Sequence, residues 1–167
     1  MAITRLGGAN AISGAITSSN FPTGSVLQVV NKYIANQDGQ LSTTSTSFTA
    51  SGISQAITPT VVGSLLIINY SCSMADANGN SAVMHSKMYY KTGSGAFASM
   101  PSASNFHMGY VNVGHNRYSP QINSSSITTT TTDTYTFQPY FKSNNGNEVR
   151  FAHDGSSIGM TIFEVKQ

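Results

Sequence analysis

The stretch SLLIINYSCSM, residues Ser64–Met74, is the most apolar run in the sequence. Leu and Ile fill its first half, and turn residues follow it at Asp76–Asn80, which contains the hairpin dipeptide Asn-Gly. An apolar run of this length, closed by a turn signal, is typical of a strand near the middle of a sheet. We therefore predict that residues 64–74 form a central strand around which the rest of the domain is built.

Similar short runs continue along the chain, rich in Thr, Ser, Val, Ile and Tyr and separated by Gly, Asn, Asp, Ser and Pro. No stretch has the composition of a good helix. The further predicted strands are 25–35, 45–50, 53–58, 82–91, 105–113, 121–129, 133–142, 148–153 and 157–166. Without crossover helices the sheets must be antiparallel. The predicted fold is all-β, an antiparallel jelly-roll sandwich, because a hydrophobic strand at each end of the domain lets the two ends pair centrally.

Alternation of side chains predicts which residues share a face in two strands. In 82–91 the better core face carries Met84, Ser86, Met88 and Tyr90. In 133–142 one face carries Tyr135, Phe137, Pro139 and Phe141. Proline has no N–H to donate, so the second strand is predicted to be bulged or at a sheet edge at Pro139.

Charge is scarce, since 8% of the 167 residues are charged against about 25% in ordinary soluble domains. The net charge is +2, and the basic residues are dispersed between Arg5 and Lys166. This argues against nucleic acid as a partner. No apolar run approaches the ~20 residues that span a bilayer, so no membrane association is expected. A surface of this kind suits a protein that packs among copies of itself, or one that faces the outside of a cell.

No constellation for catalysis is apparent. The six acidic residues are scattered, and no G-x-S-x-G motif occurs. Cys72 is interpreted as a core residue. The four histidines, His85, His107, His115 and His153, have no metal-ligand spacing. We expect no enzyme activity, no cofactor and no metal, although the sequence leaves open whether a threefold axis gathers one histidine from each of three chains.

Residues 1–24 form a polar leader that cannot bury enough surface to fold alone. We predict an extended N-terminal arm over 1–24, followed by a β-sandwich domain over 25–167. Apolar side chains punctuate this arm at intervals, as an anchor lying in the grooves of a partner requires: Ile3, Leu6, Ile12, Ile16 and Phe21.

A second candidate site is the segment GHNRYSP, Gly114–Pro120. His115, Asn116, Arg117 and Tyr118 combine a planar cation, an aromatic ring and an amide. These groups suit recognition of sugars or of a protein surface, and a solvated loop without function is the alternative reading.

Three stretches together resemble known proteins. The start MAITRLGGANAISGAIT (1–17) resembles the start of small virion proteins of marine and cyanobacterial bacteriophages. STSFTASGISQAITPTVVGSLLIINYS (45–71) and SIGMTIFEVK (157–166) resemble the jelly-roll domain of phage head-decoration and tail-fibre proteins, which is similar to tumour-necrosis-factor and complement C1q heads. The similarity covers most of the chain as a pattern and carries no functional residue. Leu65 departs from it, since Lys or Ser is usual there.

The resemblance implies a virion structural protein, made in the host cytoplasm and located in the virion. The expected function is a homotrimeric capsid decoration (cement) protein whose arm binds the major capsid protein or another virion protein. The alternative is a short tail-fibre or receptor-binding protein that contacts host surface glycans. A fibre usually has a long repetitive shaft, and this sequence has no internal repeats.

Overall fold

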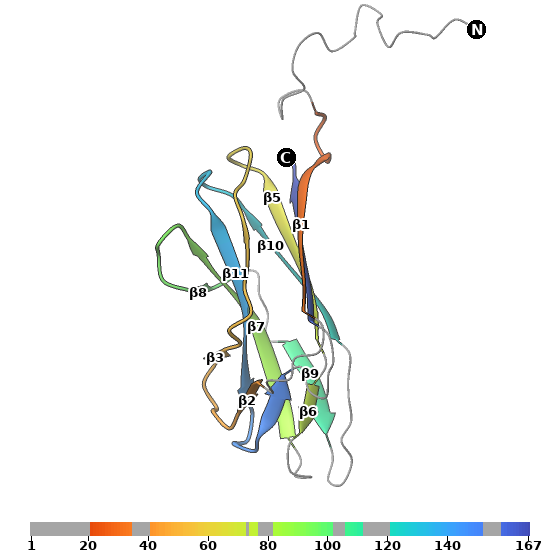
Figure 1. The fold of residues 1–167 in the computed structure, drawn as a ribbon, viewed down its shortest axis with the longest axis vertical. Coiled ribbons are helices and arrows are strands. Elements are labelled where there is room, and N and C mark those ends of the chain that lie inside the picture. Colours follow the sequence, from red (N-terminus) through yellow and green to blue (C-terminus); the bar gives the residue numbers. More distant parts are fainter. Residues whose placement is uncertain are drawn as a thin grey trace, which may run out of the picture.

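A computed structural model describes residues 21–34, 41–72, 74–76, 82–101, 106–111, 121–151 and 158–167. Within these ranges the chain forms strands and no helix (Figure 1). The strands are β1 (Val26–Ile34), β2 (Leu41–Thr43), β3 (Thr49–Ala50), β4 (Gln55–Ile57), β5 (Leu65–Cys72), β6 (Met74–Asp76), β7 (Ala82–Thr92), β8 (Ala98–Ser99), β9 (Phe106–Val111), β10 (Gln121–Thr128), β11 (Tyr135–Ser143), β12 (Val149–Phe151) and β13 (Ile158–Val165). The described part of the chain therefore contains no helix that could cross a membrane.

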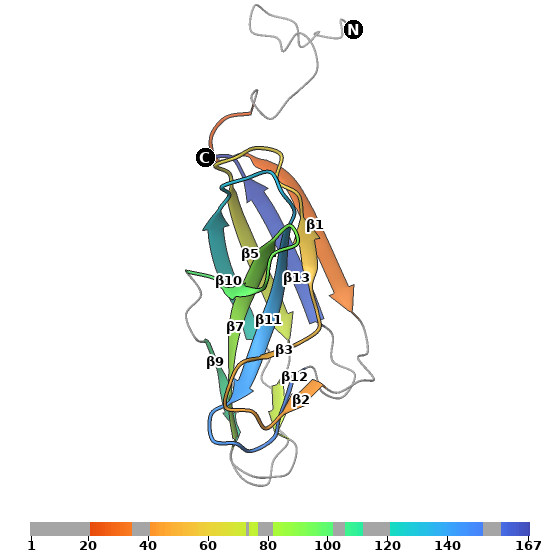
Figure 2. The same cartoon turned by 90° about the vertical axis from the view of Figure 1, so that its left-hand side faces the viewer.

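Two antiparallel sheets form the layers of a sandwich, as Figures 1 and 2 show. One has the order β1-β13-β5-β10. In the other, β3 and β4 pair with β11, which pairs with β7, and β7 pairs with β8 and β9. Eight strands remain if β2–β4 count as one interrupted strand and the short β6, β8 and β12 are set aside. In this count β1, β13, β5 and β10 of the first sheet are the first, eighth, third and sixth strands. In the second sheet β2–β4, β11, β7 and β9 are the second, seventh, fourth and fifth strands. This is the jelly-roll order, and the predicted fold class is confirmed.

Strand β5 lies inside its sheet, between β13 and β10. Its side chains alternate strictly: Leu66, Ile68 and Tyr70 are at most 1% exposed, while the residues between them are half-buried. The prediction of a central strand is therefore confirmed for residues 65–72, whereas Met74, which was predicted to end it, belongs to β6. The two ends of the domain also pair, because β1 lies against β13, but β1 occupies the edge of the sheet rather than its centre.

The opposite layer supplies the other half of the core. Met84, Ser86 and Met88 of β7 are fully buried, as predicted, and Tyr90 packs against them from a half-buried position. On β11 the four residues predicted to share one face are all buried. The Tyr70 hydroxyl and the Ser86 hydroxyl form a hydrogen bond, which joins β5 of one sheet to β7 of the other. Two polar groups that would each be costly to bury alone are thereby satisfied.

Pro139 corrects one prediction. β11 is neither bulged nor at an edge there, because its register with β7 runs unbroken from Tyr135 to Ser143. The Pro139 carbonyl accepts a hydrogen bond from Ser51 N–H at 3.1 Å. The N and C=O of one strand residue point to the same side, so the missing N–H faces residues 51–54, where β3 has ended and β4 has not begun. The interruption that Pro139 requires therefore lies between β3 and β4, and not in β11 itself.

A buried carboxylate closes the end of the sandwich at which β1 begins. Glu164 follows Ile158, Met160 and Ile162 on the inner face of β13 and is 0% exposed. Its carboxylate accepts hydrogen bonds from Gln28 Nε2 at 2.7 Å, Thr60 N–H at 2.9 Å and Thr60 Oγ1 at 3.1 Å. It thereby joins β1 and β13 to the loop that leads into β5. Burial by itself raises the pKa of Glu164, but the hydrogen bonds from Thr60, Gln28 and Val61 outweigh it and hold the pKa below its usual 4.5.

Glu164→Gln should lower the free energy of unfolding by about 1–3 kcal/mol at pH 7, because an amide cannot accept all these hydrogen bonds. The folded pKa of Glu164 is depressed, so its contribution is fully present above the unfolded value of 4.5 and is lost as the pH falls through the folded value. The difference between wild type and E164Q should therefore shrink at pH 3. Urea unfolding at both pH values measures it.

Glu148→Gln is the matched control, since Glu148 forms a partly exposed ion pair with Arg150 at 3.7 Å. It should cost at most about 1 kcal/mol. Equal effects of the two substitutions would contradict a special role for the Glu164 cluster.

Candidate interaction surfaces

The chain enters the domain through hydrogen bonds to its own C-terminal end. Gly24 N–H donates to the Lys166 carbonyl at 2.8 Å, and Lys166 N–H donates to the Ser25 carbonyl at 2.9 Å. The Lys166 ammonium also donates to the carbonyl of Phe21. Gly24 has a φ of 86°, which a residue with a side chain rarely adopts. Residues 21–25 are thus attached to the end of β13.

Of the predicted anchoring residues, Phe21 alone lies in the described part of the chain, with 39% of its surface exposed. Ile3, Leu6, Ile12 and Ile16 lie outside the described residues, so their anchoring role stays a prediction. Because Phe21 is held beside Lys166, residues 1–20 join the domain at the end where β1 begins and β13 stops. Figure 1 shows this end at the top, near the C-terminus.

His115, Asn116, Arg117 and Tyr118 also lie outside the described residues. The strand ends on either side of them are described. Val111 pairs with Ala82 at the start of β7, and Gln121 pairs with Cys72 at the end of β5. The start of β5, by contrast, pairs with Val165 near the chain entry. Segments 1–20 and 112–120 therefore join the domain at opposite ends of β5, which are about 23 Å apart at ~3.3 Å per residue.

Only one histidine side chain falls within the described structure. His85 lies on β7 with 9% of its surface exposed, and the register sets it opposite His107 of β9. Sequence spacing could not reveal this juxtaposition, because it depends on which strands pair. No group of three or more His, Cys, Asp or Glu that could hold a metal occurs among the described residues.

The pairing builds an uncharged surface on the outer face of the β1-β13-β5-β10 sheet. Its residues form rows across the four strands, and none of the described members carries a charge. From the chain entry to the far end, the rows are Val26–Val165–Leu65–Thr128, Val29–Phe163–Ile67–Ser126, Asn31–Thr161–Asn69–Ser124 and Tyr33–Gly159–Ser71. The first two rows are mainly apolar and the last two mainly polar. We call this surface the neutral face.

Three of its side chains protrude strongly: Val26 and Val29 are each 51% exposed, and Tyr33 is 66% exposed. Between Val29 and Tyr33, Asn31 Nδ2 donates to Thr161 Oγ1 at 2.7 Å, so the polar row is partly satisfied within the sheet. Apolar surface without charge is typical of the buried centre of a protein–protein interface. The neutral face is therefore a candidate contact surface for another protein molecule.

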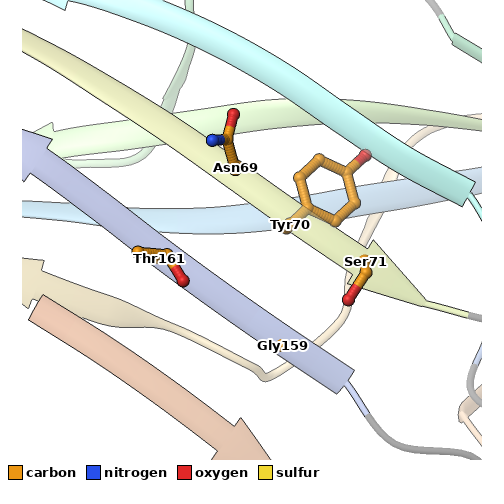
Figure 3. A pocket seen from close by; sticks show the side chains of 5 residues that line it. All are labelled: Asn69, Tyr70, Ser71, Gly159 and Thr161. Atoms are coloured by element: carbon orange, nitrogen blue, oxygen red, sulfur yellow. The ribbon is translucent and has the colours of Figure 1, made fainter.

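A shallow pocket lies in the polar half of this face, lined by Asn69, Tyr70, Ser71, Gly159 and Thr161 (Figure 3). Gly159 leaves it open, since a Cβ there would lie 3.2 Å from the Ser71 hydroxyl. Its side-chain polar groups are neutral amides and hydroxyls. A nucleophile with an adjacent base is absent from this lining, so the pocket can accept a protruding side chain but offers no acid–base chemistry.

No protein-family model matches the sequence, and a comparison with curated proteins finds no match. Among solved structures, the fold is similar to the structure of the infectious bursal disease virus Gx strain, with 13% identity and a TM-score of 0.47. That match covers 89% of this chain and 36% of the other. It is also similar to the crystal structure of the VP2 subviral particle of the same virus, with 14% identity, coverage of 84% and 42%, and a TM-score of 0.38. The chain thus spans about two fifths of the length of these proteins, and the likeness is too remote to assign a function.

Val29→Lys should abolish self-association through the neutral face, because a buried ammonium without a partner is costly. Sedimentation analysis should then show monomers where the wild type is oligomeric. Val62→Lys is the matched control, since Val62 is 61% exposed but lies in the loop before β5. The assignment of this face fails if V29K and wild type have the same mass, or if V62K dissociates as well.

Proposed function

We propose that the protein is a bacteriophage virion structural protein: a capsid decoration (cement) protein that assembles as a homotrimer and attaches through its N-terminal arm. The observation that carries the proposal is the attachment of residues 21–25 to Lys166, which places the point where the arm joins at one end of the jelly roll. The resemblance of residues 1–17 to phage virion proteins supports the same reading.

Self-association is supported by the neutral face. A chain with 8% charged residues has little repulsion to keep copies apart, and the four rows of this face add no charge of their own. In a cyclic trimer each copy contacts the next through two different surfaces. We assign the neutral face as one of them and place the protein in the virion after synthesis in the host cytoplasm.

The arm contributes attachment by ordering on the partner. A polar segment with spaced apolar side chains loses conformational entropy when it docks, which lowers the affinity of each arm. Three arms on one trimer compensate for this loss, because the first contact raises the effective concentration of the other two. The partner that we propose is the major capsid protein or another virion protein. The proposal includes no catalytic activity, so purified protein should release no sugar from host-envelope glycans.

Deleting residues 1–20 should leave a folded oligomer that no longer binds capsids, because the contacts of Phe21–Ser25 with Lys166 are retained. Cosedimentation with capsids that lack the protein measures this. Replacing Ile3, Leu6, Ile12 and Ile16 by Ser should have the same effect at full arm length. Replacing Thr4, Ser13 and Ser18 by Ala is the control. Undiminished capsid binding by the truncated protein would overturn the proposal.

Avidity gives a second test. If three arms act together, monomeric V29K should bind capsids about 10²–10⁴-fold more weakly than the wild type although its arm is intact. Titration of capsids with labelled protein measures the ratio. Equal affinities of monomer and oligomer would show that each arm acts alone.

The alternative is a short tail-fibre or receptor-binding protein that contacts host surface glycans. It is favoured by the position of segment 112–120, which joins the domain at the end remote from the chain entry. An arm bound to the particle would leave that end facing outward. The copy number in purified virions separates the two functions: a number that scales with the major capsid protein indicates decoration, and a few copies indicate a tail fibre.

A further inference from the structure

The outer face of the second sheet carries a continuous row of aromatic side chains. Tyr89 of β7 and Tyr140 of β11 stack with ring centroids 3.9 Å apart and an interplanar angle of 20°. Phe48, from the loop before β3, lies 6.2 Å from Tyr89, and Phe97, from the loop before β8, lies 6.2 Å from Tyr140. All four are half-buried, so part of each ring is accessible. We call this row the aromatic ladder.

Lysines stand at both ends of the ladder and beside it. Lys142 Nζ lies 5.3 Å from the ring centroid of Phe48, and Lys91 Nζ lies 5.3 Å from that of Phe97. Lys87 pairs with Tyr140 in the register of β7 and β11, on the same outer face. Lys142 pairs with His85, six residues before Lys91, so the lysines are spread over about 20 Å of the sheet at ~3.3 Å per residue.

None of the three lysines forms an ion pair with another residue of the described ranges. The ion pair between Arg150 and Glu148 does not involve them. Glu164 is buried in the other sheet. If the aromatic rings served only to cover the sheet, no charged groups would be needed beside them. The lysines at both ends of the row, which have no carboxylate partner among the described residues, favour an anionic ligand through charge complementarity.

The arrangement of the aromatic ladder favours an acidic polysaccharide over a nucleic acid as the polyanion. The two central rings stack on each other, so the face that each presents to the other is closed to a nucleotide base, and single strands bind by stacking their bases on aromatic faces. Three lysines are also few for binding a phosphate backbone at physiological salt. Sugar rings can pack their apolar C–H faces against partly exposed aromatic rings such as those of the ladder. The carboxylates of an acidic sugar chain would then contact the lysines.

We propose that the β11–β7 outer face binds an acidic polysaccharide, with the aromatic ladder against the sugar rings and Lys87, Lys91 and Lys142 against the carboxylates. This binding function is independent of capsid attachment and of the neutral face, because it uses the opposite sheet. A particle coated with the protein would thereby gain weak, repeated attachment to carboxylated glycan layers.

The test uses the full-length protein and polygalacturonate as the probe, measured by titration calorimetry at low and physiological salt. Neutral dextran and oligo-dT serve as comparison ligands. We expect binding to polygalacturonate that weakens with salt and no binding to dextran. Binding to dextran with equal affinity, or preferential binding to oligo-dT, would overturn the proposal.

Substitutions locate the site. Lys91→Gln and Lys142→Gln should each weaken polygalacturonate binding about two- to fivefold. Lys32→Gln is the charge-matched control: Lys32 donates to the Ser54 carbonyl at 3.0 Å on the inner side of β1, away from the ladder, so its effect should stay below about twofold. Tyr140→Leu should remove most of the binding and Tyr140→Phe should restore it, since a ring is what the sugar contacts.

Thermal melts check that the ladder variants fold, and their binding to capsids is measured in parallel. Retained capsid attachment together with lost polysaccharide binding supports a separate site. Loss of both in K91Q and K142Q, with no loss in K32Q, would identify the ladder as a capsid contact as well and would overturn the independence of the two functions, and unchanged polysaccharide binding in K91Q and K142Q would overturn the assignment of the site. Absence of polysaccharide binding in the wild type would refute this inference without affecting the test of the N-terminal arm.

Discussion

The hydrophobic core between the two sheets constrains the rest of the structure, because it takes up one face of β5, β7, β11 and β13. Leu66, Ile68 and Tyr70 of β5 fill it from one layer, and Met84 and Met88 of β7 fill it from the other. A strand has only two faces, and its side chains alternate between them. The side chains of the outer faces do not form the core. Any binding function of the sandwich therefore uses these faces or the loops at its ends.

The two outer faces differ in chemistry. The neutral face has no charge in its four rows and protruding apolar groups such as Val29, which suits contact with another copy. The face of β7 and β11 carries lysines beside stacked aromatic rings, which suits a polyanion with apolar rings. The ends of the sandwich differ as well, since the chain entry at Phe21 lies at one end and the strand ends at Val111 and Gln121 lie at the other. One small domain can thus present separate surfaces to a particle, to its own copies and to a ligand.

Local patterns explain how much was predictable. The buried faces of β7 and β11 follow from alternation within each strand, so Met84, Met88, Phe137 and Phe141 were assigned correctly from sequence. Pro139 was misread because its effect depends on the neighbouring strand, in which residues 51–54 leave the gap that a missing N–H requires. The role of Glu164 was missed altogether. An acidic residue at the end of an apolar strand carries no signal that Gln28 and Thr60 will enclose it, since both lie more than a hundred residues away.

By itself, the sequence determined the all-β class, the central position of residues 65–72 and the uncharged character of the surface, because period-two alternation and composition are local properties. Tertiary structure alone decided which distant residues become neighbours. Lys87, Lys91 and Lys142 read as dispersed charges along the chain, yet antiparallel pairing of β7 with β11 gathers them around Tyr89 and Tyr140. The register of strands fifty residues apart is set by packing across the whole sandwich, so the surfaces on which function rests appear only once the sheets are assembled.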